Sequence, residues 1–306
     1  MSATSTVMTS TSVGRTSLHT ATPSFFGLVR GELFKIRKQW TTWIMLGLLV
    51  CVMALPNLVL MSVSQLKTRI TTAPLDVLYR ITGIDLPIIR IFLGFFLLIL
   101  TARVFGLEYQ LGTIRIILGR GVGRLQLLSA KLLAVVLVAL AVLVGALVYE
   151  GLWSVILFLS FAGNLSVLSA ATPTFWSDTG MFLVTVLISM GATILLAMAV
   201  TTIGRSLSFG LSFALSWFAV DNFGVVIMTL AFRLTGNDFW QNVTAYFLGP
   251  NLNLMQQVIV GSHPSPVGIT PLVTVDGTHT LVVALVYSLI FAVTAVVLTR
   301  QRDVKE

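Results

Sequence analysis

Six long apolar segments constrain this chain more than any other feature of its sequence. A helix needs about 20 apolar residues to cross the hydrocarbon core of a bilayer. Only 10% of the 306 residues are charged, against about 25% in soluble domains. The sequence therefore predicts an all-α polytopic membrane protein with six transmembrane helices, at Trp40–Ser62, Leu86–Leu107, Leu127–Tyr149 (extending towards Leu159), Gly180–Ile203, Leu207–Phe232 and Thr280–Thr299.

The positive charges predict the orientation of these spans. Cytoplasmic loops carry an excess of Lys and Arg. With the N-terminus inside, most of the 19 Lys and Arg residues lie on the cytoplasmic side, so we expect a plasma-membrane protein with both termini in the cytoplasm. The net charge of +8 then indicates contact with anionic lipid. Nucleic acid is disfavoured as a partner, because no basic stretch has interleaved aromatics on a polar fold.

The chain before the first span divides into two parts. Residues 1–22 are rich in Ser and Thr and lack an apolar run, which predicts a disordered cytoplasmic tail. Residues 23–39 predict an amphipathic interface helix, whose apolar face comprises Phe25, Val29, Leu33, Ile36 and Trp40. Such a helix lies flat in the membrane interface. The alternative is a plain basic flank of the first span.

Residues 40–302 form the predicted six-helix domain, and its longest outer loop is residues 233–279. Aromatic and apolar residues at helical spacing predict a short helix there: Phe239, Trp240, Val243, Tyr246 and Phe247. Asn237 is a candidate cap of this helix, and Gly249 and Pro250 are expected to stop it. A second short helix is expected at Leu252–Val260. Both are too short to span, so we expect re-entrant or interfacial helices; the alternative is an aromatic belt.

The sequence offers no chemistry of an enzyme. It contains no G-x-x-x-x-G-K-[ST] phosphate loop and no H-E-x-x-H zinc motif. The three histidines lie outside the predicted spans, so no span supplies the histidine base that a serine protease needs. The single cysteine, Cys51, makes neither an internal disulfide nor a cysteine metal cluster. We expect no catalytic residue, no metal and no cofactor in this chain.

Two acidic residues, Glu150 and Asp221, fall inside or beside predicted spans, towards the outer side. An ionisable group at that depth is costly unless it faces a partner or a wet cavity. One interpretation is that they line a translocation path. The other is that each forms a buried structural pair, with Arg90 or Arg233.

Residues 106–131 form a basic, glycine-broken loop between the second and third spans, GLEYQLGTIRIILGRGVGRLQLLSAK. One face of a short helix there is apolar and comprises Leu111, Ile114, Ile117 and Leu118. Arg115 and Glu108 lie off this face. Gly119, Gly121 and Gly123 are expected to end this helix and turn the chain, because glycine accepts positive φ. The loop therefore presents a short helix to the cytoplasm at the junction of two spans.

This loop resembles that of the permease subunits of type-2 ATP-binding-cassette exporters. The matching residues are Gly106, Glu108, Gly112, Thr113, Arg115, Leu118, Gly121, Arg124 and Lys131. The segment LVRGELFKIRKQWTTWIMLGLL is similar to the N-terminal stretch of that family. Six spans with both ends inside and two short outer helices also fit, so the resemblance covers residues 24–302.

The resemblance implies a permease that couples to a separate ATPase subunit, which would bind the ATP and Mg²⁺. The loop helix would be the coupling helix, with Tyr109, Gly112, Thr113, Ile114 and Leu118 packing on the ATPase. Glu108, Arg115 and Arg120 would fix its register by polar contacts. The interface helix would lie beside the ATPase and on anionic lipid through Arg30, Lys35, Arg37 and Lys38. A second permease subunit, identical or different, is expected.

An alternative of another class is a membrane-embedded sensor or resistance protein that binds a ligand without ATP-driven transport. It would need no ATPase, so a stable complex with an ATPase separates the two. A secondary transporter is disfavoured by the lack of inverted repeats. The resemblance favours export over import, and the sequence leaves the substrate open.

Overall fold

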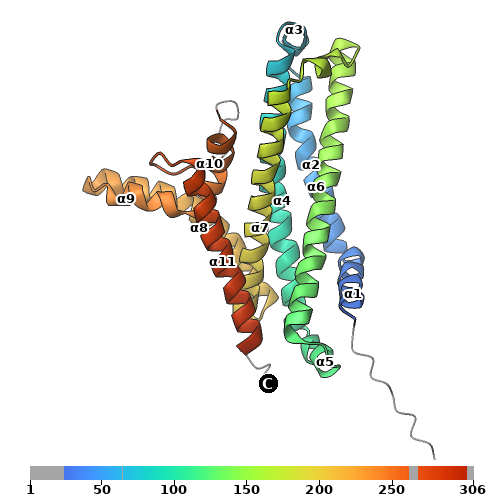
Figure 1. The fold of residues 1–306 in the computed structure, drawn as a ribbon, viewed down its shortest axis with the longest axis vertical. Coiled ribbons are helices and arrows are strands. Elements are labelled where there is room, and N and C mark those ends of the chain that lie inside the picture. Colours follow the sequence, from blue (N-terminus) through green and yellow to red (C-terminus); the bar gives the residue numbers. More distant parts are fainter. Residues whose placement is uncertain (1–23, 64, 262–267, 302–306) are drawn as a thin grey trace, which may run out of the picture.

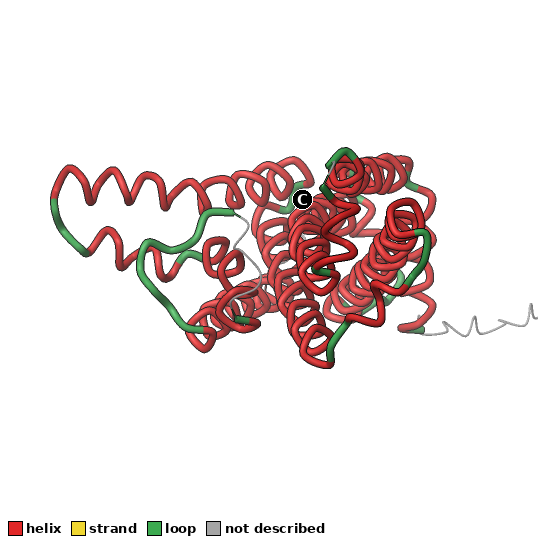
Figure 2. Tube along the Cα trace, turned by 90° about the horizontal axis from the view of Figure 1, so that it is seen from above, coloured by secondary structure: helices red, strands yellow, loops and turns green. Residues whose placement is uncertain are grey.

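The computed structural model describes residues 24–63, 65–261 and 268–301, and within these ranges it contains helices and loops and no strand (Figure 2). The predicted tail, residues 1–22, and the predicted first residue of the interface helix, Pro23, lie outside the described residues. In the described part of the chain, six helices are long and apolar enough to cross a membrane, which confirms the predicted number of spans. They are α2 (Trp40–Met61), α4 (Pro74–Gln110), α6 (Arg124–Ala162), α7 (Pro173–Gly204), α8 (Leu207–Thr235) and α11 (Gly277–Gln301).

Three of these helices extend far beyond the predicted spans. α4, α6 and α7 contain 37, 39 and 32 residues, which at 1.5 Å per residue is about 48 to 58 Å, against a hydrocarbon core of about 30 Å. The helix that contains the expected second span therefore begins before Leu86, at Pro74. Pro74 and Pro173 occupy the first turns of α4 and α7, where the missing N–H costs nothing.

The outer extensions have their own apolar core. The short helix α3 (Leu66–Thr72) and the 3₁₀ helix η1 (Ser166–Ala170) pack there against α4, α6 and α7. Leu66, Leu157, Phe158, Val167 and Phe175 are buried in this cluster, which is separate from the main core. Figure 1 shows this outer cap at the end of the molecule opposite α5 (Thr113–Gly119).

The main core is built around α4 and α7. In each of them, 61% of the most apolar stretch is buried, against 22% in α2 and 17% in α8. Their buried side chains include Ile89, Leu93, Leu97, Val186 and Ala197. α8 and the short helix α9 (Phe239–Val243) project away from this bundle (Figure 1 and Figure 2). α8 therefore leaves most of its apolar surface uncovered by its own chain.

The outer loop contains the expected short helices with shifted bounds. Asn237 Oδ1 accepts a hydrogen bond from the Phe239 backbone N at 2.9 Å, as expected for a cap at the start of α9. A 3₁₀ turn, η2 (Thr244–Tyr246), follows, and then α10 (Leu248–Val260). Gly249 and Pro250 lie in the first turn of α10 instead of stopping a helix, because backbone N–H groups in a first turn have no partner within the helix.

Gly106 brings the last turns of α4 and the first residue of α8 together. A Cβ atom at Gly106 would lie 2.7 Å from the Cα of Leu207, the first residue of α8. Backbone at that distance cannot yield without moving a helix, so only glycine fits. Gly94 is in the same helix, but a Cβ there would meet nothing within 4 Å.

These two glycines allow a matched test of the α4–α8 contact. We expect Gly106→Ala to lower the free energy of unfolding by about 1–3 kcal/mol, because overpacking forces the helices apart. Gly94→Ala should be neutral or stabilising by up to about 1 kcal/mol, since alanine is the better helix former. Thermal unfolding of the purified protein in detergent measures both, and equal shifts would contradict the close contact.

Candidate functional site

The loop between α4 and α6 contains the expected short helix. α5 (Thr113–Gly119) is joined to α4 through Gly112, whose φ of 68° lies in the left-handed region. A second glycine with positive φ, Gly121 at 83°, turns the chain after α5, and α6 begins at Arg124. Glycine adopts these angles without strain. Gly112 thus serves the backbone turn that sets the angle between α4 and α5.

The side chains of α5 and its flanks divide between two faces. Tyr109, Ile114 and Leu118 line a cavity of about 40 Å³ beside α5, together with residues of α6, α7 and α11. Leu111 and Ile116 are 64% and 58% exposed. Arg115 and Arg120 are also exposed, and Thr113 is half-buried. The face open to a partner therefore carries Leu111 and Ile116 with two arginines.

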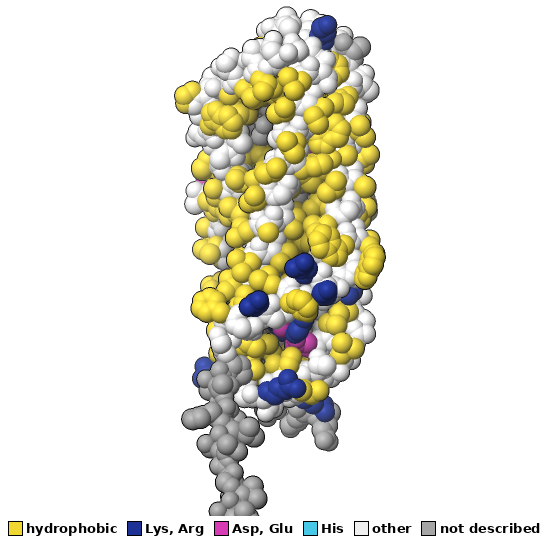
Figure 3. Space-filling view, turned by 90° about the vertical axis from the view of Figure 1, so that its right-hand side faces the viewer, with side chains coloured by type: hydrophobic (Ala, Val, Ile, Leu, Met, Phe, Trp, Pro, Cys, Tyr) yellow, Lys and Arg dark blue, Asp and Glu magenta, His cyan; other side chains and the backbone are white. Residues whose placement is uncertain are grey.

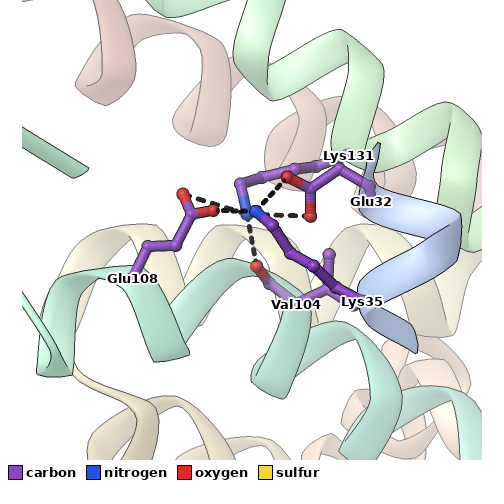
Figure 4. Close-up of polar contacts among 5 residues, drawn as sticks. All are labelled: Glu32, Lys35, Val104, Glu108 and Lys131. Carbon is purple, nitrogen blue, oxygen red and sulfur yellow. Dashed lines mark hydrogen bonds and ion pairs between the residues drawn. The ribbon is translucent and has the colours of Figure 1, made fainter. Parts of the chain in front are cut away.

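Four charged side chains meet beside α5 in a closed ring (Figure 4). Glu32 and Lys35 belong to α1 (Phe25–Lys38), whereas Glu108 lies in the last turn of α4 and Lys131 lies near the start of α6. Lys35 Nζ donates to Glu32 Oε1 at 2.7 Å and to Glu108 Oε1 at 2.6 Å. Lys131 Nζ lies 3.4 Å from Glu32 Oε2 and 3.2 Å from Glu108 Oε2. Each carboxylate thus bridges both ammonium groups.

The ring is electrically balanced and largely shielded from water. The side chains of Glu32, Glu108 and Lys131 are only 5–8% exposed, and the ring contains two positive and two negative groups. Lys131 Nζ also donates to the Val104 carbonyl oxygen at 2.6 Å. Ions in such a place cost several kcal/mol each unless they are paired. The ring therefore holds α1, α4 and α6 in one arrangement in which all four charges are satisfied.

Lys35 is the ring's link to the surface, since its side chain is 47% exposed. Burial lowers the pKa of Lys35, but its hydrogen bonds to Glu108 and Glu32 outweigh this, and the net pKa is raised above the usual value. Lys35 therefore stays protonated at neutral pH, and the ring keeps both of its bonds from this ammonium group.

The apolar stripe of α1 packs against its own chain. Val29 and Ile36 are buried in the main core, Phe25 and Leu33 are partly buried against it, and α1 contacts α6. The opposite side of α1 exposes Arg30, Lys35, Arg37 and Lys38, and Lys38 lies over the Phe34 ring. The fifth residue of the predicted stripe, Trp40, is 82% exposed. Arg30, Arg37 and Lys38 thus remain open to lipid or a partner.

The sequence prediction missed Glu32 and assigned Glu108 and Lys35 to outside partners. In the structure Glu32 is buried, and Glu108 with Lys35 bonds within the chain. One signal was present: Glu32 is the only acidic residue between Pro23 and Asp76 in a strongly basic segment. A single acidic residue in a basic segment indicates that its carboxylate pairs with a positive charge of the same chain.

The positive charges gather at the end of the molecule that carries α1 and α5. Figure 3 shows a broad band of hydrophobic side chains, with lysines and arginines concentrated below it on the face in view. The two ends of the molecule therefore differ in charge, and the end that carries α1 and α5 is the basic one.

The two acids near the outer side do not pair with arginine in the described part of the chain. Glu150 Oε2 accepts a hydrogen bond from Asn57 Nδ2 at 2.8 Å, and Asp221 accepts one from the Gly249 backbone N. Arg90 instead donates to the Leu252 carbonyl oxygen at 3.1 Å and to Asn253 Oδ1 at 2.7 Å. The expected ion pairs with Arg90 are therefore wrong, because Arg90 donates its hydrogen bonds to neutral oxygen atoms of α10. Arg233 is exposed on α8.

The ring predicts unequal effects of removing its two lysines. Lys131→Met leaves two buried carboxylates facing one ammonium group, so we expect a loss of about 3–5 kcal/mol in the free energy of unfolding. Lys35→Met should cost clearly less, because water reaches its half-exposed position. Thermal unfolding in detergent compares the two variants, and a larger loss for Lys35→Met would contradict the burial order of the ring.

Comparison with known proteins places the chain in a family. A model of the ABC-2 family transporter proteins matches residues 28–244, well over half of the chain. No curated protein and no solved structure gives a significant match. The matched region runs from α1 through α8 to the outer helices and includes both the ring and α5. With its six apolar spanning helices, the chain therefore belongs to the ABC-2 family of transporter proteins.

Proposed function

We propose that this chain is the permease subunit of an ATP-driven exporter and that α5 is its contact with a separate ATPase subunit. Membership of the ABC-2 family supports the permease role. The chain has no phosphate-binding loop of its own, so ATP and Mg²⁺ would be held by the ATPase. The exposed apolar and basic face of α5, made by Leu111, Arg115, Ile116 and Arg120, supports docking at this point. Tyr109, Thr113, Ile114 and Leu118 would support that face from behind.

The observation that carries the mechanism is the charged ring of Glu32, Lys35, Glu108 and Lys131. α5 is joined covalently to α4 and α6, and the ring fixes α1 to the same two helices. If a closing ATPase displaced α5 or α1, α4 and α6 would therefore move together. In this proposal Glu108 acts through the ring and does not touch the ATPase. Arg30, Arg37 and Lys38 hold the outer side of α1 on anionic lipid and beside the ATPase.

The transporter would contain two permease subunits in the plasma membrane, with their termini in the cytoplasm. The uncovered apolar surface of α8 supports a second subunit at that helix. The gathering of Lys and Arg at the α5 end supports a cytoplasmic location for α5. The resemblance to exporters supports outward transport.

Charge reversal on α5 tests the docking site. We expect Arg115→Glu to abolish or strongly weaken co-purification with the ABC ATPase encoded beside this protein, because it reverses a charge on the docking face. Lys67→Glu is the matched control, since Lys67 is exposed on α3 at the opposite end of the molecule. Co-purification from nanodiscs measures both variants.

Two results would contradict the docking proposal. Unchanged binding and ATPase stimulation in Arg115→Glu would place the contact elsewhere. A folded, monodisperse wild-type protein that binds no ATPase would favour a ligand sensor or resistance protein.

The ring predicts that docking and transmission can be separated. We expect Glu32→Gln to retain the complex with the ATPase but to lower transport-linked ATP hydrolysis, because α1 loses its ionic attachment to α4 and α6. Lys67→Gln, an exposed change on α3 at the opposite end of the molecule, should leave that hydrolysis close to the wild-type rate. Equal hydrolysis by both variants would show that the ring is structural only.

A further inference from the structure

A cavity of about 380 Å³ lies between the outer ends of α4, α6 and α7, below η1. Its wall is mostly apolar and includes the aromatic rings of Phe158, Phe175 and Trp176. Two acidic side chains, Asp85 and Glu150, belong to the same wall. The volume lies within the range of about 300–1,000 Å³ that is usual for small-molecule sites.

The two acids form one buried carboxyl pair. Asp85 and Glu150 are 4% and 7% exposed, and their carboxyl groups lie close enough together to interact. Two adjacent carboxylates repel each other, so a pair that shares one proton retains one negative charge. Asn57 donates to Glu150, whereas Asp85 Oδ1 is buried without a hydrogen-bond partner. The pair is thus incompletely satisfied at the wall of the cavity.

The chain supplies no counter-charge for this pair. No lysine or arginine in the described ranges makes an ion pair with Asp85 or Glu150. A buried charge without a partner is costly. The charged ring at the cytoplasmic end shows the opposite case, where every carboxylate has two ammonium partners. The missing positive charge at the outer cavity is the feature that points to a ligand.

We propose that this cavity binds a lipophilic organic monocation, an amine or quaternary ammonium compound with an apolar body. The carboxyl pair would supply the single negative charge, and Phe158, Phe175 and Trp176 would contact the cation and its apolar part. A metal ion fits poorly, because hard cations take six or more oxygen ligands and the rest of this wall is apolar. As a transport substrate site the cavity rests on the proposed permease function, but binding itself requires no ATPase.

Two residues of the cavity wall are exposed. Trp176 is 60% exposed, and Gly151 beside Glu150 is exposed as well. A Cβ atom at Gly151 would meet nothing within 4 Å. A larger side chain at Gly151 would therefore enter the cavity without displacing backbone, which provides a variant that blocks the site and keeps both acids.

Calorimetric titration of the protein in phosphatidylcholine nanodiscs, with no ATPase present, tests the proposal. The probes are benzyltrimethylammonium and its neutral carbon isostere neopentylbenzene. We expect the cation to bind the wild type more tightly than the isostere. The double variant Asp85→Asn/Glu150→Gln should lose affinity for the cation by about tenfold or more, because the countercharge is removed. Gly151→Leu should also abolish binding.

Asp76→Asn is the matched control, because Asp76 is in the same helix but exposed and outside the cavity. It should bind the cation as the wild type does. Equal affinity of the wild type and the double variant for the cation would overturn the proposal, as would equal affinity of the wild type for the two probes. Undiminished binding by Gly151→Leu, or displacement of the probe by Ca²⁺, would overturn it too. Since the titration contains no ATPase, a failed docking test in Arg115→Glu leaves its result unaffected.

Discussion

The closed ring of Glu32, Lys35, Glu108 and Lys131 is the interaction on which the end of the molecule that carries α5 depends. Each of its charges is stable there only because the other three are present, so the ring favours one relative placement of α1, α4 and α6. Apolar packing alone would allow α1 to slide along α6, because contacts between aliphatic side chains have little directionality. The ring thus supplies specificity at the point where the family's coupling contact is expected.

The two ends of the spanning bundle use charge in opposite ways. At the end that carries α5, the buried ions are balanced within the chain. At the outer end Asp85 and Glu150 share a cavity wall and have no basic partner in the described residues. Arg90 lies between the two ends and bonds to Leu252 and Asn253 of α10, which secures the outer helices to α4. Paired charges at one end suit a fixed contact between helices. Unpaired negative charge at the other end suits a site for a positively charged ligand.

Hydropathy predicted the spans well because apolar length is a local property of the sequence. It failed at Pro74, where Asp76, Arg80 and Asp85 interrupt the apolar pattern although the helix continues, since a helix does not end at the edge of the hydrocarbon core. The short helix α5 followed from local spacing and glycines. The ring did not, because Lys35 and Glu108 are 73 residues apart, and Glu32 and Lys131 are 99 apart. Such pairings depend on how α1 packs, which no local pattern records.

The close approach at Gly106 makes α4 a lever with unequal arms. Only the last turn of α4 lies on the cytoplasmic side of this contact, whereas the helix extends from Gly106 back to Pro74 on the other side. At 1.5 Å per residue the long arm measures about 48 Å. A rotation of about five degrees about Gly106 would therefore move the outer end by roughly 4 Å, while the end beside α5 moves by less than about 1 Å. A small displacement beside α5 would thus be enlarged at the opposite end of α4.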